Sequence, residues 1–161
     1  MSSSPVFLTS RIPVSDLEAS LAFYTEMLGF IPLGGLDIDE PDFTEVFLAD
    51  STGRPCFTVQ CCAETPVPRG PAWGILALAV PSAEALAELA AKIEAAGYRL
   101  PAPLTSLGPM QYFFAADPDG YLVEVVHQPG GAAMPEPAAD GSYELGKLPT
   151  VPPGILGNTF G

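Results

Sequence analysis

The chain has 161 residues, 48% of them hydrophobic, which is enough for one domain or for two small modules that share a core. It carries 19 Asp and Glu residues against 6 Lys and Arg residues, a net charge of −13. This balance argues against nucleic acid and anionic membranes as partners, because both are bound through basic patches. It suits a neutral or cationic small molecule, although acidity more often serves solubility.

The cysteines and the N-terminus indicate a cytoplasmic protein. Cys56, Cys61 and Cys62 form neither a CxxC pair nor the spacing of a metal knuckle, so we expect reduced cysteines within strands. Residues 1–5 lack the basic and long apolar segments of a signal peptide. The apolar run at residues 73–80 is too short to span a bilayer.

The first part of the chain predicts a strand, a helix and three further strands. A strand over residues 6–14 leads into a helix that begins with a capping box of Ser15 and Glu18 and ends at Gly29. One face of this helix is apolar at helical spacing. The three strands that follow are expected at residues 30–33, 43–49 and 56–62.

The same order returns after a Pro- and Gly-rich linker. A strand precedes Ser82, which caps a helix that ends at Gly97, and the turn at residues 117–120 (Asp-Pro-Asp-Gly) closes the last hairpin. The later strands are expected at residues 98–100, 110–116 and 121–127. The chain thus predicts an α+β fold from a duplicated βαβββ unit, with a first module at 1–62, a linker at 63–71, a second module at 72–128 and an extension at 129–161.

The C-terminal extension is rich in Pro, Gly and Ala and has no regular period. Its scattered large apolar residues can anchor it on the body of the protein or on a partner subunit; they are Leu145, Leu148, Ile155, Leu156 and Phe160.

Two segments carry a family resemblance. Residues 11–24, with the motif Ser-Leu-Ala-Phe-Tyr, run into Leu-Gly-Phe at 28–30, and residues 113–124 contain the Asp-Pro-Asp-Gly turn. Both resemble the glyoxalase/bleomycin-resistance/extradiol-dioxygenase superfamily, also called vicinal oxygen chelate, and with the repeat the likeness covers residues 6–128. It implies a curved mixed sheet around a cleft, helices on the outer face, and a homodimer. These motifs cap a helix and turn a hairpin, so they specify fold more than function.

In metal-using members of this family, ligands project into the cleft from the first and last strands of each module. The resemblance places these positions at Thr9, Gln60, Ile75 and Glu124, with a histidine usual at the first. The only histidine, His127, should point away from Glu124, since the two are three residues apart on one strand. One carboxylate and one amide are a poor set for a divalent metal, so we expect no metal and no other cofactor.

Strand alternation predicts which other residues face the cleft. Arg11 can clamp a carboxylate or phenolate, and Trp73 can stack on a flat ligand, unless it merely packs against the linker. Gln111 and Phe113 are the favoured cleft residues of their strand. Glu124 either binds a cationic group or accepts a proton, or it pairs with Arg11 across the cleft.

Three functions remain open from the sequence. The first is a metal-free protein that binds a drug-sized aromatic or cationic molecule, nearest to the bleomycin-resistance branch. The second is a glyoxalase-like lyase, isomerase or dioxygenase. In it Glu124 either acts as a base, with Arg11 holding an oxyanion, or ligates a metal together with Gln60 and waters. The third is a non-catalytic partner or regulatory module, which only the apolar extension supports. The ligand itself stays open.

Overall fold

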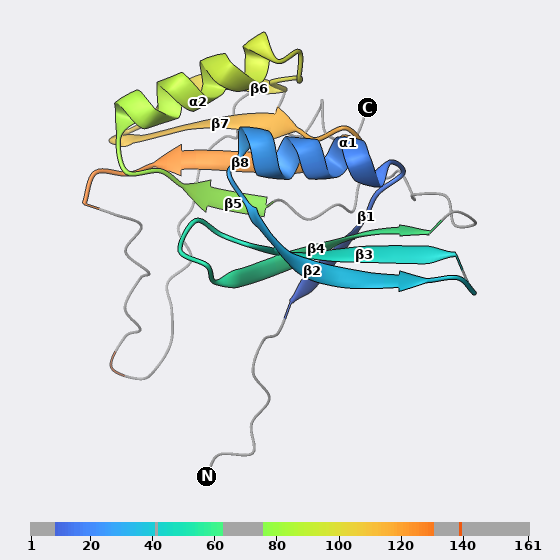
Figure 1. The fold of residues 1–161 in the computed structure, drawn as a ribbon. Helices are drawn as coiled ribbons and strands as arrows, with labels where there is room; N and C mark the ends of the chain where they lie inside the picture. Colours follow the sequence, from blue (N-terminus) through green and yellow to red (C-terminus); the bar gives the residue numbers. More distant parts are fainter. Residues whose placement is uncertain (1–8, 41, 63–75, 131–138, 140–161) are drawn as a thin grey trace. The chain divides into compact units, whose positions relative to one another are not determined.

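A computed structural model describes residues 9–40, 42–62, 76–130 and 139 of the chain. The chain divides into two compact units, Met1–Arg69 and Gly70–Gly161. Each unit contains a four-stranded sheet, and in each the sheet is combined with helical structure (Figure 1).

The first unit consists of one strand, a helical segment and three strands. Its sheet has the order β1-β4-β3-β2, with β1 parallel to β4 and the other neighbours antiparallel. The elements are β1 (Ser10–Pro13), α1 (Leu17–Ala22), the π-helical turn η1 (Phe23–Met27), β2 (Ile31–Ile38), β3 (Phe43–Ala49) and β4 (Pro55–Cys62).

The second unit repeats this topology. Its sheet has the order β5-β8-β7-β6, and β5 is parallel to β8. The elements are β5 (Leu76–Ala79), α2 (Ala83–Ala95), β6 (Ala102–Leu107), β7 (Met110–Ala116) and β8 (Leu122–His127). The predicted α+β fold with a duplicated βαβββ unit is therefore confirmed.

Local chemistry sets the ends of the helices. The hydroxyl of Ser82 accepts a hydrogen bond from the Ala85 amide at 3.1 Å, as predicted for the cap of α2. For α1 the predicted cap is wrong by one residue, because Asp16 rather than Ser15 accepts from the Ala19 amide, at 2.9 Å. Gly29 has φ +76° and ends the first helical segment in the left-handed conformation, as predicted.

One face of the first sheet is covered by α1 and η1. There Phe57 of β4 makes edge-to-face contacts with Tyr24 and Phe30, at ring-centre distances of 4.9 and 5.0 Å. Val59 is buried with them. Because side chains alternate along a strand, Thr58 and Gln60 lie on the opposite side of the sheet, which we call the Thr58 face.

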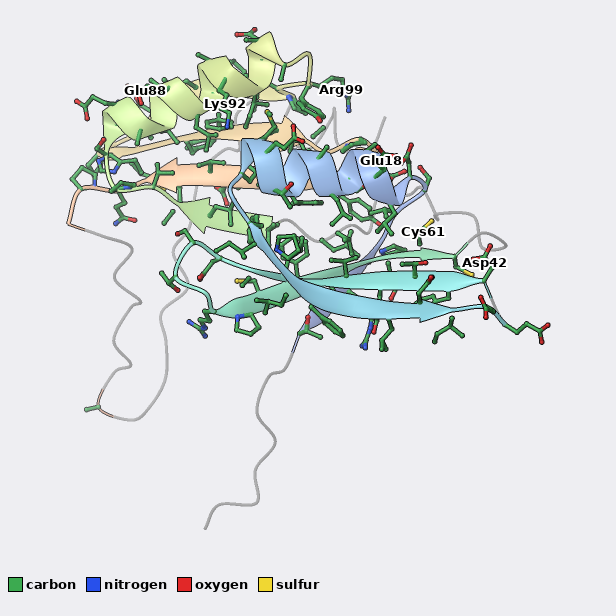
Figure 2. All side chains as sticks on the ribbon, in the orientation of Figure 1. Glu18, Asp42, Cys61, Glu88, Lys92 and Arg99 are labelled. Atoms are coloured by element: carbon green, nitrogen blue, oxygen red, sulfur yellow. The ribbon has the colours of Figure 1, made fainter. Side chains whose placement is uncertain are left out.

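The second sheet packs on α2 in the same way. This helix buries Leu86, Ala90 and Ile93, while Glu88 and Lys92 extend from its other side (Figure 2). The repeat places Val123 and Val125 at the positions of Phe57 and Val59, so both lie on the helix-covered face.

Two strands differ from their predicted positions. β6 spans residues 102–107 instead of 98–100, and its Pro103 is tolerated because β6 is an edge strand. β2 continues to Ile38 instead of residue 33, through a register shift between Pro32 and Gly34.

The predicted linker and nearly all of the C-terminal extension lie outside the described residues. None of the helices in the described part is long and apolar enough to cross a membrane.

Candidate binding faces on the two sheets

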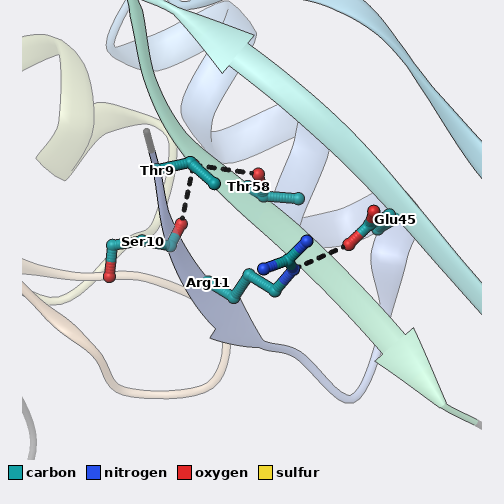
Figure 3. Close-up of polar contacts among 5 residues, drawn as sticks. All are labelled: Thr9, Ser10, Arg11, Glu45 and Thr58. Atoms are coloured by element: carbon teal, nitrogen blue, oxygen red, sulfur yellow. Dashed lines mark hydrogen bonds and ion pairs between the residues drawn. The ribbon is translucent and has the colours of Figure 1, made fainter. Parts of the chain in front are cut away.

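An ion pair crosses the Thr58 face of the first sheet (Figure 3). Arg11 of β1 reaches over β4, and its Nε donates a hydrogen bond to Oε2 of Glu45 on β3 at 3.0 Å. The Glu45 side chain is only 4% exposed, whereas the Arg11 side chain is 53% exposed. A carboxylate so removed from water needs a charged partner, and Arg11 supplies it.

Two threonine hydroxyls lie beside this ion pair. The Oγ1 atoms of Thr9 and Thr58 are 3.1 Å apart, and Thr58 is fully buried. Arg11 is the register partner of Thr58 in the parallel pair, and Glu45 is the register partner of Gln60. Thr9, Arg11 and Gln60 thus share one face, and their role in binding a ligand stays a prediction.

The repeat corrects one of the predicted ligand positions. Arg11 pairs with Thr58 in the first sheet, as Ala77 pairs with Glu124 in the second. The counterpart of Glu124 is therefore Thr58 and not Gln60. Thr9 lies two residues before Arg11, so its counterpart in the second unit is position 75, two residues before Ala77. Both Ile75 and Trp73 lie outside the described residues.

Glu124 lies on an apolar face of the second sheet. It is next to Ala77 of β5 and Phe114 of β7, on the face whose buried cluster is Ala102, Tyr112, Phe114 and Leu122. Burial raises the pKa of the Glu124 carboxyl. Among the described residues Glu124 has no hydrogen-bond or ion-pair partner, and the ion pair of Arg11 is with Glu45, so the predicted pairing of Arg11 with Glu124 is not found there.

Gln111 and Phe113 were predicted on the wrong side of the second sheet. Phe113 pairs with Val125, and Gln111 pairs with His127, whereas Glu124 pairs with Phe114. Tyr112 and Phe114 are therefore the aromatic residues on the face of Glu124. The sequence could not separate the two sides, because β7 is apolar on both and residues 112–116 are all buried.

The donors present do not fit the metal site that the family resemblance implies. Thr9 and Thr58 offer neutral hydroxyls that are hydrogen-bonded to each other, and Glu124 offers a single carboxylate. His127 lies on the other face, as predicted, with Nδ1 3.3 Å from the carbonyl oxygen of Val80. In the described part of the chain no three His, Cys, Asp or Glu side chains converge on a metal position.

The raised pKa of Glu124 predicts a pH-dependent cost in stability. Its ionised form is less favourable in the folded state, so stability should fall as pH rises from the ordinary value of 4.5 through the raised folded pKa. Glu124→Gln removes this cost, and we expect the variant to be more stable than the wild type near neutrality by up to about 1 kcal/mol, since the carboxylate keeps part of its hydration.

Urea denaturation from about pH 4 to about pH 8 measures this difference, which should vanish at the acidic end. Glu88→Gln on the exposed side of α2 is the matched control and should change little. A gain from Glu124→Gln that is equal at both ends of the range would contradict the prediction.

Comparison with known proteins gives the family. The sequence model of the Glyoxalase/Bleomycin resistance protein/Dioxygenase superfamily matches residues 6–125, and the chain belongs to this superfamily. A probable lactoylglutathione lyase of Vibrio cholerae is 30% identical over 125 residues, which are 74% of this chain and 88% of that protein. The probable chloroplastic lactoylglutathione lyase of Arabidopsis thaliana is 28% identical over 138 residues, but the match spans only 38% of its length against 84% of this chain.

Solved structures show the same fold. The glyoxalase I of Leishmania major, described as trypanothione-dependent, superposes with a TM-score of 0.66 at 27% identity, over 79% of this chain and 89% of that one. TnmS3, an antibiotic-binding protein from Streptomyces, superposes with a TM-score of 0.60 at 19% identity, over 80% of this chain and 99% of that one.

Proposed function

We propose that this protein binds a small molecule without a metal ion. The hydrogen bond between Thr9 and Thr58 carries the proposal. It joins two neutral side chains at two of the positions where metal-using relatives would place ligands. The same fold occurs in an enzyme and in an antibiotic-binding protein, so the residues of the site, and not the fold, must decide between these functions.

The surroundings of Glu124 favour a ligand with a cationic group on an aromatic body. A half-buried carboxylate with no partner among the described residues gains most from a positive charge brought beside it. The net charge of −13 would add steering of a cation toward the protein. 4-Phenylbutylamine should therefore bind in calorimetric titration, and 4-phenylbutanol should bind about tenfold more weakly.

Glu124→Gln should remove this preference for the amine, because it removes the charge and keeps the shape of the side chain. Gln128→Glu, an exposed position that adds a charge near the end of β8, controls for long-range attraction and should change amine binding little. Equal binding of amine and alcohol to the wild type would refute the role of Glu124.

Metal analysis tests the absence of a metal. We expect much less than one transition-metal ion per chain after purification without chelator, and an unchanged melting temperature in EDTA. One tightly held ion per chain would overturn the proposal.

A lyase is the second candidate, and the names of the curated relatives support it. In this reading Glu124, whose raised pKa suits a general base, would move a proton while Arg11 holds an oxyanion. Formation of lactoylglutathione from the hemithioacetal of methylglyoxal and glutathione, with and without added Ni²⁺ or Zn²⁺, separates the candidates. Binding without chemistry predicts no turnover in either condition.

The family resemblance also leads us to propose a cytoplasmic homodimer. The solution mass of the full chain, set against that of a chain ending at residue 130, tests the dimer and the contribution of the C-terminal extension to it.

A further inference from the structure

The Thr58 face of the first sheet combines a polar strip with an apolar strip. The polar strip consists of Thr9, Arg11, Glu45, Thr58 and Gln60. The apolar strip lies beside it on β2 and β3, because Leu36 pairs with Glu45 and Ile38 pairs with Phe43. Leu36 is 52% and Ile38 is 42% exposed, and among the described residues the exposed large hydrophobic side chains lie on β2 except for Leu104.

Arg11 lies at the border of the two strips and has N–H donors that no described residue uses. Its guanidinium carries five N–H donors in a planar fork, and Glu45 takes the one on Nε. The two terminal nitrogens have no partner in the described part of the chain, and the side chain is half exposed. A planar acceptor with two oxygens matches this fork.

Glu45 makes Arg11 a fixed donor rather than a mobile surface charge. A buried ion pair is weak evidence for a stabilising role, since well-packed apolar residues often serve stability better. Glu45 holds the guanidinium over β4, where Thr58 is the register partner of Arg11, on the side of the sheet opposite α1 and η1 (Figure 3). Its position is therefore explained better by orienting Arg11 than by strengthening the sheet.

We propose that this face binds the carboxylate of an apolar organic acid. The carboxylate accepts two hydrogen bonds from the terminal nitrogens of Arg11, and the hydrocarbon part lies along Leu36, Ile38 and Phe43. Glu45 is a positioning residue in this arrangement. The proposal rests on the proposed small-molecule binding and adds to it a second ligand class and the residues of the first sheet that hold it.

Three compounds that share a phenylbutyl body test the proposal on the full chain by calorimetry. We expect 4-phenylbutyrate to bind about tenfold more tightly than the neutral 4-phenylbutanamide. The double variant Arg11→Gln/Glu45→Gln leaves no unpaired buried charge and should bind both compounds equally. An equal affinity in the wild type, or a preference that survives in the double variant, would overturn the proposal. If 4-phenylbutylamine alone binds, only this inference fails; if none of the three binds, the proposed function fails with it.

Two single substitutions test the parts of the site. Glu45→Gln removes a negative charge, so a simple charge effect would tighten butyrate binding, whereas loss of orientation should weaken it several-fold. Tighter binding therefore refutes the positioning role. Leu36→Ser should weaken butyrate binding and leave the mass in solution unchanged. If it dissociates an oligomer instead and leaves the affinity unchanged, the apolar strip is a subunit interface and the proposal fails.

Discussion

Gly35→Ala is expected to destabilise the protein by about 3 kcal/mol, the upper part of the range for overpacking. A Cβ atom at Gly35 would overlap the backbone carbonyl of Glu45 on β3. Backbone atoms cannot rotate away as a side chain can, so β2 and β3 would have to separate where they pair. The backbone of Gly35 is not in the left-handed conformation, so the cost is steric and not conformational.

Gly53→Ala is the matched control, in the turn between β3 and β4. Gly53 has φ +81° and no atom within 4 Å of a Cβ placed on it, so alanine there should cost about 1 kcal/mol through the left-handed backbone alone. Urea denaturation of both variants gives the comparison. A smaller loss of stability for Gly35→Ala than for Gly53→Ala would contradict the prediction and mean that the β2 backbone shifts at Gly35 at little cost.

Much of the fold was predictable because its signals are local. Ser82 caps its helix, Gly97 has φ +86°, and the side chain of Asp117 accepts hydrogen bonds from the amides of Asp119 and Tyr121 in the final turn. Each of these depends on a few neighbouring residues, which the sequence displays directly. The recurrence of such local signals in both halves of the chain was sufficient to predict the duplicated unit.

The candidate site was harder to predict because it depends on register between distant strands. Glu45 lies on a half-buried, mostly apolar strand, where an acidic residue is ordinarily solvent-facing, and only pairing across β4 brings it to Arg11. The side of the sheet on which Phe113 lies was predicted wrongly for a related reason. β7 does not alternate between polar and apolar residues, so its orientation is fixed only by its pairing with β8, which carries Glu124. The sequence named Arg11 but assigned it a different partner.

Breaking the ion pair on one side is the second large effect that we expect. Arg11→Gln leaves the Glu45 carboxylate, only 4% exposed, without a cation. The loss for a fully buried pair is about 3–5 kcal/mol, but Arg11 is half exposed and water can enter once the guanidinium is gone, so we expect about 1–3 kcal/mol. Arg99→Gln, at an exposed arginine after α2, is the control and should stay within about 0.5 kcal/mol of the wild type.

The double-mutant cycle separates this charge effect from lost packing. Adding Glu45→Gln to Arg11→Gln removes the buried negative charge that lost its cation. The two amides can hydrogen bond, so most of the lost stability should return. Measurement of all four proteins by urea denaturation gives the coupling energy, which we expect to be about 1–2 kcal/mol. If the double variant is less stable than Arg11→Gln alone, the carboxylate of Glu45 stabilises the sheet without Arg11, and its burial must be explained by contacts other than this ion pair.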